Sequence, residues 1–367
     1  MDEKLVKIIA GFPSFGELKS AKAFGNGHIN DTILLTYEGA EPGMDRVVLQ
    51  KINKNVFHKP DEVMKNTVGI TSFLREKIIA AGGDPERETI NVIPALDGLP
   101  YVIDDDGDYW REVRFIADAT SYDAVEKIED FYASAVAFGK FQRQLSDYPA
   151  DELFETIPGF HDTRARFIRF RKVVEDDVAG RADGVRDEIQ FILDREDLAN
   201  FSMNSLDSGK LPLRVTHNDT KLNNIMIDNA TGKAICVIDL DTTMPGLVMN
   251  DFGDAIRFGA STAAEDETDL DKVTCDLDYY DIYTKGFLEG CGESLTDYEK
   301  ETLPMGAKGI TYEQAIRFLT DYLEGDTYYK TEYPEHNLVR ARTQIKLVKD
   351  MEDKWDAIQA INKKYIG

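Results

Sequence analysis

The sequence predicts an α+β protein of two lobes, a small lobe with an antiparallel sheet and one helix, then a larger, mostly helical lobe. The chain of 367 residues is long enough for about two domains or one bilobal unit. Residues 20 to about 116 alternate in hydrophobicity as strands do, whereas later segments carry apolar residues at helical spacing. We therefore predict an N-terminal lobe over 1–116 and a C-terminal lobe over 117–367.

The small lobe is predicted to follow the order strand, strand, strand, helix, strand, strand. Its helix begins at Pro60 with Asp61 in the first turn, and it ends before Gly82. The predicted strands are 21–24, 29–37, 46–52, 89–93 and 109–116, the last entered through an acidic turn at 104–107. In the large lobe, helices are predicted at 128–145, 164–174, 185–193 and from about 279 onward.

Charge and cysteine content exclude several classes of protein. The net charge is −25, from 43 Lys and Arg against 68 Asp and Glu, which argues against nucleic acid and anionic membrane surfaces as partners. Residues 1–12 lack a long apolar core with a small-residue cleavage site, so no signal peptide is expected. No apolar run approaches about 20 residues, so no membrane-spanning helix is expected. Three cysteines without a C-x-x-C pair favour a reducing cytoplasm, and a monomer is expected.

The octet HNDTKLNN at 217–224 fits the pattern H-x-D-x-K-x-x-N. It resembles the catalytic loop of the protein-kinase-like superfamily, in which phosphoryl transfer depends on positioning and electrostatic stabilisation. Asp219 is the candidate base for an acceptor hydroxyl, Lys221 can offset charge on the phosphoryl group, and Asn224 can ligate Mg²⁺. His217 is expected to brace the loop through hydrogen bonds. The alternative is a polar turn, since Asp and Asn favour turns.

A second carboxylate site follows the octet. Residues 233–241 form an apolar strand that ends in two acids, and oxygen ligands at a strand end suit Mg²⁺. Asp239 is therefore the second predicted metal ligand. Residues 251–253 spell Asp-Phe-Gly, but they lie 27 residues beyond Asn224, so Asp251 is expected to cap a helix over 252–258.

Gly25 and Gly27 lie where that superfamily has a phosphate-binding loop, and glycine permits close backbone approach. His28 and Asn30 share a face at strand spacing and could contact a phosphate or a polyhydroxylated acceptor. A tight polar hairpin would have the same sequence, so this alternative stays open.

Nucleotide contacts are predicted at three further places. The third strand offers Lys51, with Gln50 facing the other way, and either could contact the phosphates. Glu62 is a possible partner of Lys51, or an exposed helix acid. The segment that contains Arg114 and Ile116 should pass the adenine, where backbone groups would bind the base.

Together these motifs resemble the aminoglycoside phosphotransferase branch of the protein-kinase-like superfamily, and in particular its N-acetylhexosamine 1-kinases. The resemblance covers nearly the whole chain and rests on residues 27–30, 213–225, 238–242, 251–262, 317–326 and 333–348. It implies a bilobal protein-kinase-like fold, ATP with Mg²⁺, and transfer to the anomeric hydroxyl of N-acetylglucosamine or N-acetylgalactosamine.

The resemblance also implies that His28, Asn30, Arg317 and Tyr328 surround the sugar. Arg317 could instead pair with Asp321 one turn later, and Tyr328 could be an ordinary core residue. One alternative function is a kinase for choline, ethanolamine, homoserine or an aminoglycoside. A pseudokinase is the other alternative, and it would lack a base or metal ligand, whereas this sequence has candidates for both.

Overall fold

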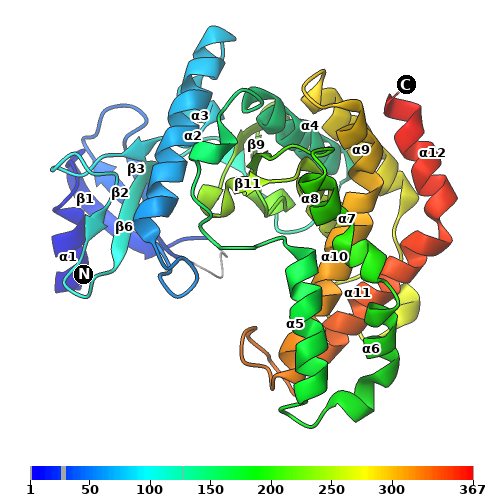
Figure 1. Cartoon of the computed structure of the whole chain (residues 1–367). Helices are drawn as coiled ribbons and strands as arrows, with labels where there is room; N and C mark the ends of the chain where they lie inside the picture. The colour runs from blue at the N-terminus through cyan, green and yellow to red at the C-terminus, as the bar shows by residue number, and fades with distance from the viewer. Residues whose placement is uncertain (1, 26–29, 126, 367) are drawn as a thin grey trace. The chain divides into compact units, whose positions relative to one another are not determined.

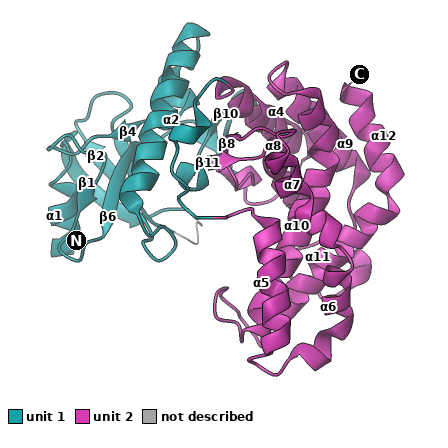
Figure 2. Ribbon diagram, in the orientation of Figure 1, with its two compact units in different colours: residues 1–121, 147–158, 225–244 teal, residues 122–146, 159–224, 245–367 magenta. Residues whose placement is uncertain are grey.

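A computed structural model describes residues 2–25, 30–125 and 127–366 (Figure 1). The described chain divides into two compact units (Figure 2). Unit 1 comprises Met1–Ser121, Asp147–Pro158 and Ile225–Met244, and unit 2 comprises Tyr122–Ser146, Gly159–Asn224 and Pro245–Gly367. Two later segments thus return to unit 1, and the functional division at residue 116 stays a prediction. The predicted α+β class is confirmed, with an antiparallel sheet followed by a mostly helical part.

The main sheet of unit 1 is antiparallel, with strand order β1-β2-β3-β6-β4 and β5 paired to β6. Its strands are β1 (Glu17–Ala23), β2 (Asp31–Glu38), β3 (Arg46–Lys51), β4 (Val92–Ile93), β5 (Val102–Ile103) and β6 (Tyr109–Arg114). The strand predicted at 89–93 keeps only its last two residues. The short helix α3 (Pro85–Glu88), capped by Asp84, lies just before it, and Asn91 Nδ2 donates to the backbone oxygens of Pro85 and Thr89 at 3.0 Å.

Two helices pack on the main sheet of unit 1. Helix α1 (Glu3–Ile9), which was not predicted, places Ile8 in one apolar cluster with Leu49 and Trp110. Helix α2 (Pro60–Ala80) places Met64 Sδ 3.9 Å from Arg111 Nη1. Because neighbouring residues of a strand point to opposite faces, Trp110 and Arg111 show that the two helices lie on opposite faces of the sheet.

Unit 1 also holds a three-stranded sheet of order β10-β9-β7. Its strands are β7 (Ala119–Thr120), β9 (Ile225–Asp228) and β10 (Ala234–Val237). A 3-10 turn, η4 (Leu240–Thr242), follows β10 closely and carries the acids that end the predicted apolar strand.

Unit 2 is built from helices around the long helix α10. Its helices are α4 (Ile128–Gln144), α5 (Thr163–Asp176), α6 (Arg186–Leu193), α7 (Glu196–Asp207), α8 (Val248–Gly259), α9 (Leu277–Cys291), α10 (Asp297–Leu323), α11 (His336–Asp353) and α12 (Trp355–Ile366). Short strands β8 (Arg214–Thr216) and β11 (Met244–Gly246) pair with each other. Among the described residues, none of the helices combines the length and apolar character needed to cross a membrane.

Helices α8 and α10 approach each other backbone to backbone. A methyl group on Gly253 of α8 would overlap the carbonyl of Gly306 in α10, and one on Gly306 would overlap the carbonyl of Met249. Glycine at both contact points therefore sets the spacing of α8 and α10. This contact matters because α8 supports the candidate active site.

Glu112 on β6 is a buried acid in the core of unit 1. Its side chain is fully buried, and neither carboxylate oxygen has a hydrogen-bond partner among the described residues. It lies opposite Leu49 of β3 and Ile93 of β4. Burial in these apolar surroundings raises the pKa of Glu112 to about 8.

Replacement of Glu112 by glutamine should remove a loss of stability at higher pH. A carboxyl whose pKa is raised on folding stabilises the native state below its unfolded pKa, and this contribution disappears as pH rises toward about 8. The quantity of interest is the free energy of unfolding of Glu112→Gln minus that of the wild type. We expect this difference to be about 3 kcal/mol larger at pH 8 than at pH 5.

Urea unfolding of both proteins between these pH values measures the difference. Glu41→Gln, a change at an exposed residue of the same unit, is the matched control. Parallel pH profiles for the wild type and Glu112→Gln would contradict the assignment of an ionisable, unpartnered Glu112.

Candidate active site

The predicted catalytic loop lies in unit 2, where it follows β8 and ends in the 3-10 turn Leu222–Asn224. Asp219 Oδ1 is 2.9 Å from Lys221 Nζ. Asn224 Nδ2 donates to the backbone oxygen of Asp219 at 2.8 Å and to its Oδ2 at 3.1 Å. The Asp219 amide donates to His217 Nδ1 at 3.3 Å, which confirms the bracing expected of His217. The structure therefore brings Lys221 and Asn224 to the carboxylate of Asp219, and His217 to its backbone amide.

The neighbours of Asp219 decide its charge state. Burial pushes the pKa of Asp219 upward, but the Lys221 ammonium and the hydrogen bond from Asn224 outweigh burial and hold that pKa below its usual value. For Lys221, burial lowers the pKa, and the carboxylates of Asp219 and Asp254 more than offset this effect, so the pKa of Lys221 is raised. Both side chains are therefore ionised near neutral pH.

Asp251 on α8 holds the backbone of this loop. Its carboxylate accepts the amide protons of His217 at 2.8 Å and Asn218 at 2.7 Å, and the Nε2 group of Gln142 at 2.7 Å. The prediction that Asp251 caps a helix from Phe252 is wrong, because α8 already begins at Val248. Asp251 lies in its first turn and caps the loop instead.

Asp254 extends the same support one turn along α8. Its Oδ2 accepts the backbone amide of Thr220 at 3.0 Å, and Thr220 Oγ1 donates to the backbone oxygen of Asp251 at 2.6 Å. Arg257 pairs with Asp254 at 3.1 Å and with Glu265 at 2.7 Å. Residues three apart share a helix face, so one face of α8 carries both acids that hold the loop.

Asp239, the second predicted metal ligand, lies in unit 1 just before η4. Its φ of 58° is in the left-handed region, which few residues other than glycine adopt. The next acid, Asp241, receives the Arg111 guanidinium on Oδ1 and the Asn30 amide on Oδ2 at 2.7 Å. Thr156 Oγ1 donates to the backbone oxygen of Asp241 at 3.0 Å.

Gln50 and Lys51 point to opposite faces of β3. Gln50 lies beside Arg111, whose Nε donates to Gln50 Oε1 at 3.1 Å. Lys51 lies on the α1 face with Leu49, and its Nζ is 2.7 Å from Asp108 Oδ2. The ammonium of the third strand is therefore directed to the acidic turn and away from Asp241.

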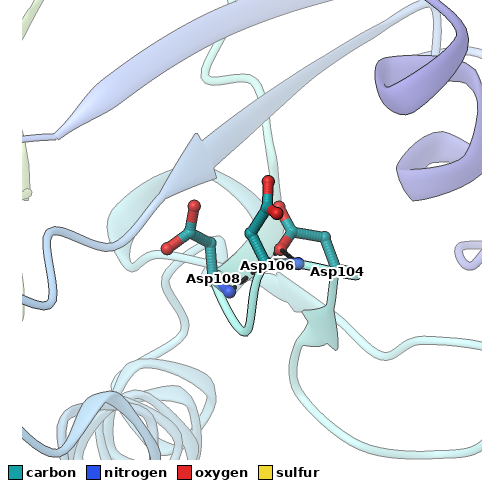
Figure 3. Close-up of side chains that lie close together, drawn as sticks. All are labelled: Asp104, Asp106 and Asp108. Atoms are coloured by element: carbon teal, nitrogen blue, oxygen red, sulfur yellow. Dashed lines mark hydrogen bonds between the residues drawn. The ribbon is translucent and has the colours of Figure 1, made fainter.

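That acidic turn brings three carboxylates together (Figure 3). Asp104 Oδ1 accepts the backbone amides of Asp106 at 2.9 Å and Asp108 at 3.0 Å. Lys4 Nζ lies 2.9 Å from Asp104 and 2.6 Å from Asp106, and Lys54 Nζ lies 2.7 Å from Asp108. These ammonium groups neutralise the turn, which explains the cluster without a bound metal.

The other predicted nucleotide contacts stay predictions. Gly25 has a φ of 80°, as a tight loop requires, but Gly27 and His28 lie outside the described residues. Arg114 bonds to the carboxylate of Glu86 and donates from Nε to the Gly43 oxygen at 3.1 Å. Ile116 is half-buried just beyond β6.

Arg317 and Tyr328, the predicted acceptor residues, both lie in unit 2. Arg317 Nη1 donates to Gln314 Oε1 at 3.0 Å, and its guanidinium carbon is 5.6 Å from the Tyr329 ring centroid. Asp321 is not the partner of Arg317, because its carboxylate accepts the backbone amides of residues 327–329 at 2.8 to 2.9 Å. Tyr328 is 69% exposed, so it is no core residue.

A buried acid on α10 lies behind the loop. Glu313 binds His161 Nδ1 at 2.9 Å and the Thr163 hydroxyl at 2.6 Å, with Arg166 Nε at 3.5 Å. Burial raises the pKa of Glu313, but His161, Arg166 and Arg317 together lower it to about 2. His161 Nε2 lies 3.4 Å from the Asn218 oxygen, which connects this cluster to the loop one residue before Asp219.

A cavity of about 600 Å³ lies beside residues 220–222 of the loop. Thr220, Lys221 and Leu222 form one wall, and Phe131 and Tyr279 contribute aromatic surface. A small molecule in this cavity would lie beside the Lys221 side chain.

The family of the chain follows from the same region. The model of the phosphotransferase enzyme family APH matches residues 20–280, which is more than half of the chain and includes the loop and Asp239. The chain belongs to this phosphotransferase family. Membership supports a small-molecule phosphotransferase activity for the chain.

Solved structures share the fold of this phosphotransferase. A GDP complex of aminoglycoside 2'-phosphotransferase-IIIa matches with a TM-score of 0.59 and 13% identity, covering 94% of this chain and 99% of that one. An amicoumacin kinase in complex with AMP-PNP, Ca²⁺ and Ami matches with a TM-score of 0.58 and 13% identity, covering 96% of this chain and 94% of that one. A choline kinase from Cryptosporidium parvum Iowa II matches with a TM-score of 0.56 and 13% identity, covering 95% of this chain and 93% of that one. At these identities the likeness establishes the fold alone.

Sequence reasoning missed several residues that support the candidate site residues within each unit. Asp254 could have been found, since it lies three residues after Asp251 on one helix face. Arg111 could have been found only once its alignment with Gln50 was known. His161 and Glu313 are 152 residues apart and belong to no local pattern.

Asp251→Asn should destabilise the phosphotransferase by about 2 kcal/mol or more, because one amide oxygen cannot accept from three donors and the new NH₂ faces buried N–H groups. Urea unfolding measures the change. Asp297→Asn, at a side chain 96% exposed, is the control and should stay within about 0.5 kcal/mol of the wild type. Equal stability of the two variants would show that the Asp251 charge does not hold the loop.

Proposed function

We propose that this phosphotransferase transfers the γ-phosphate of ATP to the anomeric hydroxyl of N-acetylhexosamines, as the N-acetylhexosamine 1-kinases do. The observation that carries the proposal is the ionised Asp219, held by Lys221 and Asn224 on a loop that α8 fixes. Such a carboxylate can orient a hydroxyl and accept its proton during in-line transfer. An AMP-PNP complex and a GDP complex among the structural neighbours support a nucleotide donor.

The lowered pKa of Asp219 makes it a weak base. An anomeric hydroxyl is more acidic than an ordinary alcohol, so it needs less from the base that takes its proton. Lys221 Nζ, next to the same carboxylate, offsets negative charge on the moving phosphoryl group. An anomeric hydroxyl is therefore an acceptor whose proton this carboxylate can take, as the proposal requires.

Asn224 and Asp239 have the donor atoms that Mg²⁺ prefers. Asn224 uses Nδ2 for Asp219, which leaves its Oδ1 as the ligand atom. Bound Mg²⁺ would neutralise phosphate charge. The two residues belong to different units, and their joint binding of the ion is part of this proposal.

The residues beside the loop in unit 2 favour an uncharged acceptor. The Glu313 carboxylate is already bound to His161 and Thr163, and Arg166 and Arg317 add two cations to the cluster. A cationic acceptor such as choline would meet positive groups, whereas a guanidinium can donate to hydroxyl and acyl oxygens. The choline and aminoglycoside alternatives are therefore less well supported, although neighbours with those names share the fold.

Asp219→Asn should lower kcat by about 10² or more, because the amide cannot accept the hydroxyl proton. ADP release in the presence of N-acetylglucosamine measures kcat. Asp183→Asn, at a side chain 90% exposed, should keep wild-type turnover. Near-normal turnover of Asp219→Asn would refute the role of Asp219.

The acceptor is tested by ³¹P NMR with Mg-ATP and N-acetylglucosamine, in which we expect a new phosphate signal coupled to the anomeric proton. Glucosamine is the matched control, because it keeps the ring but replaces the acyl group by a cation. We expect kcat/KM to fall by about 10-fold or more for glucosamine, since burial of an unpaired charge beside arginines is costly. Preference for glucosamine or choline, or coupling to the C6 protons, would contradict the proposal.

A further inference from the structure

The third strand of this chain has no cation at the end of the sheet face that lies beside Arg111 and Asp241. Arg46 of β3 is on the same face, but it lies at the other end of the strand, with its guanidinium carbon 4.2 Å from the Phe115 ring centroid. Residues Thr32, Gln50 and Arg111 stand side by side on that face, because Thr32 pairs with Gln50 and Gln50 with Arg111 in the strand register. Hydrogen bonds join the row, from Gln50 Nε2 to Thr32 Oγ1 at 3.1 Å and from Arg111 Nε to Gln50 Oε1 at 3.1 Å. The cation beside Gln50 on this face is therefore the guanidinium of Arg111, on β6.

Arg111 and Asp241 form a buried ion pair. Their side chains are 5% and 2% exposed, and Arg111 Nη1 contacts Asp241 Oδ1. Asn30 Nδ2 donates to the other carboxylate oxygen at 2.7 Å, so both oxygens of Asp241 are occupied. Buried ion pairs contribute little net stability compared with apolar residues, and a role in fixing one arrangement is a better explanation of this pair.

The segment that the pair fixes contains Asp239. Asn66 Nδ2 on α2 donates to the Thr243 oxygen at 3.1 Å, and Thr156 Oγ1 donates to the Asp241 oxygen at 3.0 Å. With the Arg111 contact, η4 is attached to the sheet, to α2 and to the segment 147–158, all within unit 1. Asp239 directly precedes η4 and is in the left-handed conformation, with a φ of 58°, which persists only where the surrounding structure holds it.

Protein kinases use a lysine of the third strand at the nucleotide. We propose that in this chain Arg111, on β6, is the positioning residue that holds Asp239 ready for the metal–nucleotide complex. Gln50 is its fixed acceptor, whereas Lys51 serves the acidic turn on the opposite face. The inference rests on the proposed kinase function, but it concerns metal and nucleotide binding and does not depend on the identity of the acceptor.

The test compares Arg111→Lys with Lys51→Met. Lysine keeps the charge, but a single ammonium cannot bond Gln50 and Asp241 with the planar fork of a guanidinium. Binding of Mn²⁺ in the presence of AMP-PNP is measured by electron paramagnetic resonance, and the Mg²⁺ dependence of kcat by ADP release. Circular dichroism and the melting temperature show whether each variant is folded.

We expect Arg111→Lys to weaken Mn²⁺ binding by about 10-fold and to raise the Mg²⁺ concentration for half-maximal kcat in parallel, with KM for the acceptor within about two-fold. Lys51→Met should leave both metal measurements within about two-fold of the wild type. Gln50→Leu, which removes the acceptor of Arg111 Nε without removing a charge, should give an intermediate loss.

Two outcomes would overturn the inference. In one, Arg111→Lys is folded and binds Mn²⁺ like the wild type. In the other, Lys51→Met loses metal binding while Arg111→Lys keeps it. Failure of the wild type to phosphorylate N-acetylhexosamines would refute the acceptor assignment alone, because Mn²⁺ binding with AMP-PNP is measured without an acceptor.

Discussion

The carboxylate of Asp251 is buried in unit 2, and its hydrogen bonds go to backbone amides and a glutamine amide and not to an ammonium group. Burial raises the pKa of Asp251, and the backbone N–H groups of His217 and Asn218 that point at its carboxylate oppose this rise. Those donors include His217 and Asn218, and Asn218 has a φ of 65°. Asp251 holds the loop in this conformation, and the loop in turn positions Asp219.

Much of the catalytic loop could be predicted from sequence because its chemistry is local. His217, Asp219, Lys221 and Asn224 lie within eight residues, and the structure joins them by contacts across two to five positions. The α+β class was predictable for a similar reason, since strand and helix periodicities extend over a few residues. What such patterns omit is the partner that holds a motif from outside.

The residues that could not be predicted depend on pairing across long distances. Lys51 and Gln50 are neighbours in sequence, and only the β3–β6 register decides which of them stands beside Arg111. Asp251 binds amides 33 and 34 residues earlier, so the Asp-Phe-Gly triplet gave no indication of its partners. The predicted strand at 89–93 is shorter in the structure because the Asn91 side chain bonds to the backbone oxygens of Pro85 and Thr89, a local contact that the apolar pattern does not reveal.

The glycine contact between α8 and α10 couples two parts of the site mechanically. Asp251 and Asp254 flank Gly253 on α8, while Glu313 lies two turns beyond Gly306 on α10 and Arg317 about one turn further. Where two helices touch backbone to backbone, neither can slide without a clash. The helix that supports the Asp219 loop and the helix that carries Arg317 are therefore fixed relative to each other at this contact. A change of acceptor would be accommodated more readily in the segment after α10, where Tyr328 is exposed, than on the helix itself.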